Sequence, residues 1–144
     1  MRIYHINNYT DAVYEAACRL LPQLSETVEI PTKREWEMIL ESPTCNLFVA
    51  ENETSQIVGM ISLVNYRIPT GLKIWIEDVV VDQSSRGLGL SRSMTLHAID
   101  FAKQMGAKNI MLTSRPSRIA ANKLYQSMGF ELRETNVYQL DTKP

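Results

Sequence analysis

Residues 79–92 read Val-Val-Val-Asp-Gln-Ser-Ser-Arg-Gly-Leu-Gly-Leu-Ser-Arg, a hydrophobic strand that passes through a polar loop into a helix. Gly87 and Gly89 carry no side chain, so their backbone N–H groups can approach an anion closely. The start of the helix adds unpaired N–H donors and a partial positive charge, and Arg86 and Arg92 add full charges. The stretch therefore predicts a site for a pyrophosphate.

A plain connection between a strand and a helix is the alternative, because a lone Gly-x-Gly turn is a weak signal. Two common nucleotide signatures are missing from the loop. A full Gly-x-Gly-x-x-Gly pattern needs a third glycine where Arg92 stands. The Gly-x-x-x-x-Gly-Lys-Ser/Thr pattern does not fit the loop either. The loop alone leaves both interpretations open.

The sequence on either side of the loop predicts regular elements. Downstream we expect helices over 90–105 and 117–128, each ended by a glycine, and between them a short apolar strand over 109–113. Upstream, apolar runs separated by turn residues indicate an antiparallel meander over 46–50, 57–66 and 72–81. Because 79–113 reads strand–helix–strand, it requires a parallel crossover.

The remaining elements lie at the two ends of the chain. The first half predicts a strand over 2–6 and helices over 11–24 and 32–40. Asp11 is the expected cap of the first helix, and Thr32 with Glu35 predicts a capping box for the second. A last hairpin or bent strand is expected over 130–133 and 136–140. Together these elements predict an α/β (α+β) fold, a mixed and mostly antiparallel sheet with helices on both faces.

The composition fits one globular domain over residues 1–144. The chain is 44% hydrophobic and 22% charged, and its net charge of −1 favours neither nucleic acid nor an anionic membrane. Cys18 and Cys45 form no Cys-x-x-Cys pair, and only two histidines accompany them, so we expect no metal site. No apolar run is long enough to span a bilayer, and the first residues lack an apolar signal core. We therefore expect a cytoplasmic protein.

Three segments, in order, resemble the GNAT superfamily of N-acetyltransferases. Arg86-x-x-Gly89-x-Ser91 is similar to the family's Arg/Gln-x-x-Gly-x-Gly/Ala signature, with Ser91 in place of Gly or Ala. Tyr125-x-x-x-Gly-Phe is similar to its later Tyr-x-x-x-Gly-Phe segment. Residues 76–81, with a Glu-Asp pair, resemble a strand of glucosamine-phosphate and polyamine acetyltransferases. The resemblance covers about 75–130, and the first half of the chain fits the family only in outline.

The resemblance implies acetyl-coenzyme A as the cofactor. The loop would bind its pyrophosphate, and the end of the preceding strand would pair with its pantetheine arm, with the Val81 N–H near the thioester carbonyl. The expected cofactor-binding residues are Val79, Val80, Val81, Arg86, Gly87, Leu88, Gly89, Leu90, Ser91, Arg92 and Asn122. Asn122 lies closer to Tyr125 than the family's usual asparagine does.

Two residues are candidates for acid–base chemistry. Strand alternation predicts that Trp75, Glu77, Val79 and Val81 share one face and that Asp78 lies on the other. Glu77 is then the expected base for the amine, and an ordinary strand-edge carboxylate is the alternative. By the resemblance, Tyr125 is the expected acid for the departing thiolate, and a core tyrosine is the alternative.

The acceptor is less well specified. Asp78, Trp75 and Tyr66 are the expected substrate residues, although Asp78 can instead bond a neighbouring backbone group. Arg115 and Arg118 form a basic pair that could bind the 3′-phosphate of the cofactor or an acidic substrate. The alternative is that both side chains are only solvated. We expect N-acetylation of a primary amine of a small molecule, such as an amino sugar or polyamine. The alternatives are acetylation of a protein lysine or N-terminus, and a non-catalytic coenzyme A-binding module. The sequence neither requires nor excludes a homodimer.

Overall fold

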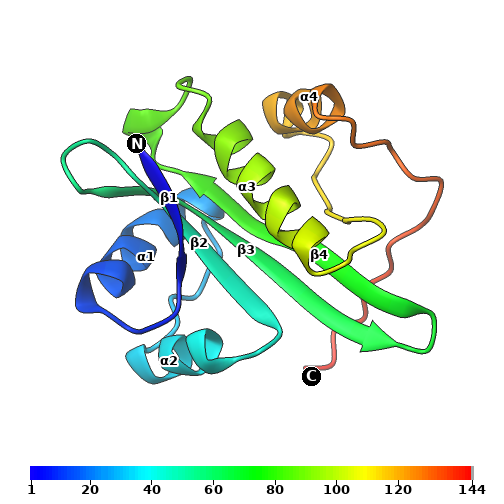
Figure 1. Cartoon of the computed structure of the whole chain (residues 1–144), viewed down its shortest axis with the longest axis horizontal. Helices are drawn as coiled ribbons and strands as arrows, with labels where there is room; N and C mark the ends of the chain where they lie inside the picture. The colour runs from blue at the N-terminus through cyan, green and yellow to red at the C-terminus, as the bar shows by residue number, and fades with distance from the viewer. Residues whose placement is uncertain (144) are drawn as a thin grey trace. The chain divides into compact units, whose positions relative to one another are not determined.

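The computed structural model describes residues 1–143 and has a mixed α/β fold (Figure 1). Its elements, in chain order, are β1 (Arg2–Ile6), α1 (Asp11–Leu24), α2 (Lys33–Glu41), β2 (Cys45–Glu51), β3 (Ile57–Ile68), β4 (Gly71–Val81), the short 3-10 helix η1 (Gln83–Ser85), α3 (Leu90–Gln104) and α4 (Ile119–Ser127). The chain forms two compact units, Met1–Thr113 and a second that begins at Ser114.

The first unit contains a four-stranded antiparallel sheet in the order β1-β2-β3-β4. The register pairs Val49 of β2 with Met60 of β3, and Met60 in turn with Val80 of β4. The predicted meander is confirmed, with strands that extend one or two residues beyond several of the predicted ends. Turn residues at 52–56 and 69–70 join neighbouring strands, as their Asn, Ser, Pro and Thr content favours.

Helices cover both faces of this sheet. One buried cluster joins α1 and α2 to one face, and its members are Ile6, Val13, Ala16, Ala17, Leu20, Leu21, Trp36, Leu47, Val49, Ile57, Met60 and Val80. Phe48 lies between two of these residues in β2, so its side chain points to the opposite face. There its ring contacts His97 and Phe101 of α3. The core is thus two layers of side chains separated by the sheet.

Local signals start the first two helices. Thr32 and Glu35 form the predicted capping box of α2, with the Thr32 hydroxyl oxygen accepting from the Glu35 N–H. The predicted cap of α1 is wrong by one residue. Thr10 is the N-cap, and its hydroxyl accepts from the Val13 N–H at 3.2 Å. Asp11 lies in the first turn instead, where its negative charge still favours the helix dipole.

The expected strand over 109–113 is reduced to one bridge. Met111 pairs with Trp75 in the parallel sense, by an Ile76 N–H to Met111 oxygen bond of 2.8 Å and a Met111 N–H to Ile74 oxygen bond of 2.9 Å. The crossover to a fifth strand is therefore not confirmed. β4 has a bulge at Asp78, three residues beyond the bridge, and this ends the straight run that a longer ladder needs.

The expected hairpin over 130–133 and 136–140 is wrong. The described residues after α4 contain no strand. The side chains of Leu132 and Tyr138 are 94% and 87% exposed, and those of Val137 and Leu140 are also exposed. An alternating apolar pattern needs a neighbouring strand and a face to bury, and in the structure this segment has neither.

Across residues 1–143, helix length and hydropathy together never reach what a bilayer crossing requires.

Candidate functional site

The loop between β4 and α3 has the backbone that an anion site requires. Gly87 and Gly89 have φ angles of +80° and +76°, in the left-handed region that glycine adopts without strain. No heavy atom lies within 4 Å of the position that a Cβ would occupy on either glycine. Gly89 is the N-cap of α3 and provides no side-chain cap. The first N–H groups of α3 therefore have no cap of their own, and an anion can serve as one.

Two arginines lie on either side of the glycines of the loop. Arg86 donates from Nε to the Val81 carbonyl at 3.2 Å, which fixes its side chain against the last residue of β4. Arg92 lies exposed in the first turn of α3, and Leu88 is 68% exposed between the two glycines. Leu90 is buried and anchors the start of the helix. The loop thus has two positively charged side chains, Arg86 and Arg92, around one turn.

A bulge in β4 corrects the predicted faces of the strand. Met60 pairs with Val80 but Ser62 pairs with Glu77, so β4 has one more residue than β3 over this stretch. Asp78 has a φ of +50°, which few residues other than glycine adopt. Val80 therefore lies on the α1 side with Glu77, whereas Val81 pairs with Gly59 and lies on the α3 side. The prediction that Val81 shares the face of Glu77 is wrong.

The two carboxylates at the bulge, those of Glu77 and Asp78, both have raised pKa values. Both Glu77 and Asp78 are exposed. The pKa of Glu77 is nevertheless raised, first because nearby protein atoms exclude water and second because of the Asp78 charge. Partial burial also raises the pKa of Asp78. Burial and then the Asp78 charge raise the pKa of the Cys45 thiol on β2, which lies on the Glu77 face.

Two aromatic side chains lie on the same face as Glu77. Val64 pairs with Trp75 across β3 and β4, and Tyr66 follows two residues later on β3, so alternation places all three on the face of Ser62 and Glu77. The Trp75 Nε1–H donates to the Tyr66 hydroxyl at 3.1 Å. The structure therefore places three of the predicted residues, Tyr66, Trp75 and Glu77, on one face of the sheet, and it joins Tyr66 to Trp75.

In the second unit, Tyr125 lies on α4. It is 7% exposed, and the edge of its ring meets Phe130 with ring centroids 5.8 Å apart. Burial raises the pKa of Tyr125, and the positive charge of Arg118 acts in the opposite direction. The hydroxyl therefore stays protonated at neutral pH, as a proton donor must.

The side chain of Asn122 forms hydrogen bonds within the turn that precedes α4. Its side-chain amide donates to the carbonyl oxygens of Arg115 and Arg118, both at 2.9 Å. These bonds close the turn that carries the two arginines, whose side chains are exposed. The side-chain oxygen of Asn122 takes part in neither of these two bonds. The predicted contact between Asn122 and the cofactor stays a prediction.

The sequence did not point to three residues that shape the loop. Asp82 accepts from the Ser84 N–H at 3.0 Å and from the Ser84 hydroxyl at 2.7 Å, which forms the turn of η1. Arg19 and Gln23 of α1 bond to this same turn. The N-cap pattern Asp-x-Ser was a local signal for Asp82. No local pattern connects it to a helix some sixty residues earlier in the chain.

Comparisons with known proteins agree on one family. The family model described as "Acetyltransferase (GNAT) family" matches residues 10–130. A mycothiol acetyltransferase of Renibacterium salmoninarum is 36% identical over 84 residues, which are 57% of this chain and 25% of that protein. The chain therefore spans about a quarter of the length of that curated relative.

Solved structures share the fold. A protein described as a putative acetyltransferase from Agrobacterium tumefaciens superposes with a TM-score of 0.85 at 22% identity, covering 98% of this chain and 100% of that one. An aminoglycoside acetyltransferase from a soil metagenome, in complex with sisomicin, also gives 0.85, at 18% identity, covering 99% and 96%. At such identities the likeness establishes the fold alone.

Proposed function

We propose, from the premise that this chain belongs to the GNAT acetyltransferase family, that it transfers the acetyl group of acetyl-coenzyme A to a primary amine of a small molecule. The observation that carries this proposal is the run of β4 into the loop 82–89. The exposed carboxylate of Glu77, whose pKa is raised, lies in this strand. About a dozen residues later α3 begins at an N-cap that provides no side-chain hydrogen bond.

The loop residues fit the pyrophosphate of the cofactor. Gly87 and Gly89 allow close approach of backbone N–H groups, and Arg86 and Arg92 supply positive charge. The bulge at Asp78 interrupts regular pairing in β4, beside the segment proposed to run along the pantetheine arm. When bound, the cofactor supplies an activated acetyl thioester.

Glu77 is the proposed base. An alkyl ammonium has a pKa of about 10 and is not nucleophilic until it loses a proton. In its carboxylate form, Glu77 accepts that proton directly or through a water molecule. Tyr125, in the second unit, is the proposed acid that protonates the departing thiolate. Its raised pKa keeps the proton on the hydroxyl until that step.

A small-molecule acceptor is supported by the names of similar proteins, which include mycothiol, streptothricin and aminoglycoside acetyltransferases. The exposed carboxylates Glu77 and Asp78 suit a cationic acceptor, because they attract the ammonium before it is deprotonated. Tyr66 and Trp75 offer an aromatic surface on the same face as Glu77.

The test has two stages. Calorimetry with coenzyme A measures cofactor binding, and release of free thiol from acetyl-coenzyme A measures turnover on aminoglycosides, amino sugars, polyamines and peptides. We expect micromolar binding and turnover on one of the small amines. Preference for peptides would move the assignment to protein acetylation. Tight binding without turnover would indicate a non-catalytic module, and a lack of binding would refute the proposal.

A further inference from the structure

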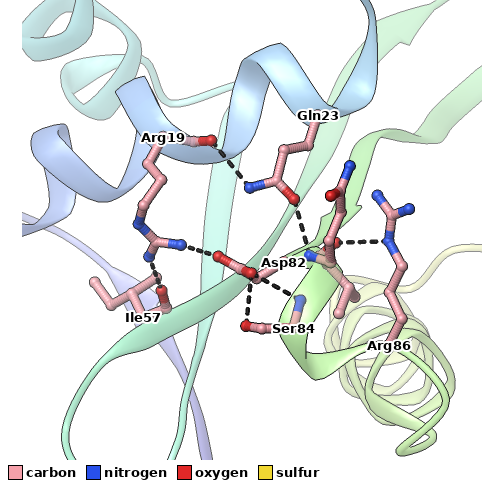
Figure 2. A network of polar contacts seen from close by, with 8 residues as sticks. Arg19, Gln23, Ile57, Asp82, Ser84 and Arg86 are labelled. Atoms are coloured by element: carbon pink, nitrogen blue, oxygen red, sulfur yellow. Dashed lines mark hydrogen bonds and ion pairs between the residues drawn. The ribbon is translucent and has the colours of Figure 1, made fainter.

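Helix α1, far away in the sequence, is hydrogen-bonded to the start of the loop 82–89. Figure 2 shows Arg19 and Gln23 of α1 pointing toward Asp82 and the start of η1. Arg19 forms an ion pair with the Asp82 carboxylate through Nη1. Its other terminal nitrogen, Nη2, donates to the Ile57 carbonyl at 2.5 Å. One guanidinium thus joins α1, the start of β3 and the end of β4.

Gln23 makes a second link beside the first. Its side-chain oxygen accepts from the Gln83 N–H at 2.9 Å, and its amide nitrogen donates to the Arg19 carbonyl at 3.2 Å. The Gln83 N–H lies at the start of η1, where the helix itself offers no acceptor. The Gln23 amide therefore satisfies a loop donor from outside the loop.

Asp82 connects these contacts to the anion site. One carboxylate oxygen meets Arg19, while the other accepts both bonds from Ser84. Ser84, Ser85 and Arg86 lead directly to Gly87, and Arg86 is itself held by Val81. A shift of Asp82 would therefore be passed along a chain of bonded residues to the glycines.

The ion pair also matters for the charge of the site. Asp82 lies five residues before Gly87, in a loop proposed to bind an anion. An unpaired carboxylate there would repel the bound phosphates. Arg19 cancels that charge, and it leaves the positive charges of Arg86 and Arg92 and the helix start to act on the anion. Both the geometry and the charge of the loop thus depend on α1.

We propose that Arg19 and Gln23 are positioning residues for the loop 82–89, which they hold in the geometry that binds coenzyme A. The identity of the ligand rests on the function proposed above. The positioning itself does not, because the contacts are internal to the protein. Neither side chain is placed against the cofactor, so their effect is exerted through Asp82 and Gln83.

Coenzyme A affinity is the first measurement. Arg19→Gln should weaken binding on the order of tenfold by calorimetry, because a charge-assisted bond is lost and a repulsive carboxylate is left. Arg19→Lys should recover part of the loss, and Asp82→Asn in the Arg19→Gln background should recover part by removing the uncompensated charge. Arg2→Gln is the matched control, because it removes an ion pair between β1 and β2 and should leave affinity unchanged.

Amide hydrogen exchange without ligand is the second measurement. Arg19→Gln and Gln23→Met should each speed exchange from Gln83 through Gly89, whereas Arg2→Gln should not. A lower melting temperature with unchanged affinity and unchanged loop exchange would show a merely structural role and overturn the proposal.

The two proposals fail separately. Absence of coenzyme A binding in the unaltered protein would refute the proposed function and the ligand named here. The exchange measurement would still decide whether α1 positions the loop.

Discussion

The indole N–H of Trp75 donates to the hydroxyl of Tyr66 at 3.1 Å, and the two rings lie on the sheet face that carries Glu77. The bond locks two partly exposed aromatic side chains of neighbouring strands into one surface, two residues from the proposed base. Both residues belong to the hairpin of β3 and β4, whose backbone pairing runs from Gly59 to Val81. A fixed and partly exposed aromatic pair of this kind is suited to contact an acceptor.

Tyr66→Phe removes this bond and keeps the ring. We expect the KM for the acceptor to rise about fivefold, because one neutral hydrogen bond contributes about 1 kcal/mol. The dissociation constant of coenzyme A should stay unchanged. Steady-state kinetics with each substrate varied in turn separates the two effects. An unchanged KM for the acceptor would remove Tyr66 from the acceptor surface.

Glu77→Gln should lower kcat/KM by a factor on the order of 10² to 10⁴, the range typical for loss of a positioned base. In the unaltered protein the base works as the carboxylate, so activity should rise as pH rises through the raised pKa of Glu77. That rise should therefore lie above the ordinary glutamate pKa of about 4.3. It should vanish in Glu77→Gln.

Asp78→Asn is the companion variant for this profile. Removal of the Asp78 charge withdraws one of the two causes that raise the pKa of Glu77. The rise of activity with pH should therefore occur at lower pH in this variant, while Glu77 itself is unchanged. If the rise of activity with pH persists in Glu77→Gln, a group other than Glu77 causes it.

Tyr125→Phe should lower kcat by about 10² or more and leave the fold intact, because the ring still packs on Phe130. The pKa of Tyr125 is raised by burial, so the acid should be lost only well above neutral pH. Thermal unfolding of the same variant supplies the control. A variant with full kcat would make Tyr125 the core tyrosine that its burial also allows.

Gly89→Ala and Gly106→Ala form a matched pair. The two glycines have φ angles of +76° and +83°, and nothing lies within 4 Å of an added Cβ on either. Each alanine should cost about 1–2 kcal/mol of stability through the left-handed backbone. Only Gly89→Ala should weaken coenzyme A binding, and Gly89→Glu should abolish it. Equal affinity in the two alanine variants would contradict the placement of the phosphate at Gly89.

His5 should make the fold less stable in mild acid. Its ring stacks on Phe48 with centroids 4.9 Å apart, and burial first, then the charge of His97, lowers the pKa of His5 from 6.5. A lowered pKa means that the folded state favours the neutral ring. This contribution to stability is present above pH 6.5 and is lost as pH falls through the lowered value.

Denaturant unfolding between pH 7.5 and pH 5 measures this loss, and His5→Phe supplies the comparison. Phenylalanine keeps the stacking but does not titrate, so the decline of stability with falling pH should be smaller in that variant. The same decline in both proteins would assign it to other groups, the carboxylates among them.

Much of the fold followed from local patterns in the chain. Alternation over 57–66 and 72–81, separated by Pro and Gly, was sufficient for the hairpin of β3 and β4. The Gly-x-Gly turn marked the start of α3 to the residue, and Gly89 at its N-cap has the left-handed backbone that glycine adopts without strain. Each of these features depends on residues a few positions apart, so its physical cause is contained in a short stretch of sequence.

The sequence by itself therefore determined the strand, the glycine loop and the helix of residues 79–104, together with the residue types of the proposed chemistry. Only the tertiary structure decided the bulge at Asp78, because a bulge is a mismatch between two paired strands and neither strand contains it alone. Only the tertiary structure brought Arg19 to Asp82, 63 residues away in the chain. It also left residues 130–140 without a strand, because strand pairing is non-local and an apolar alternation supplies only one of the two partners.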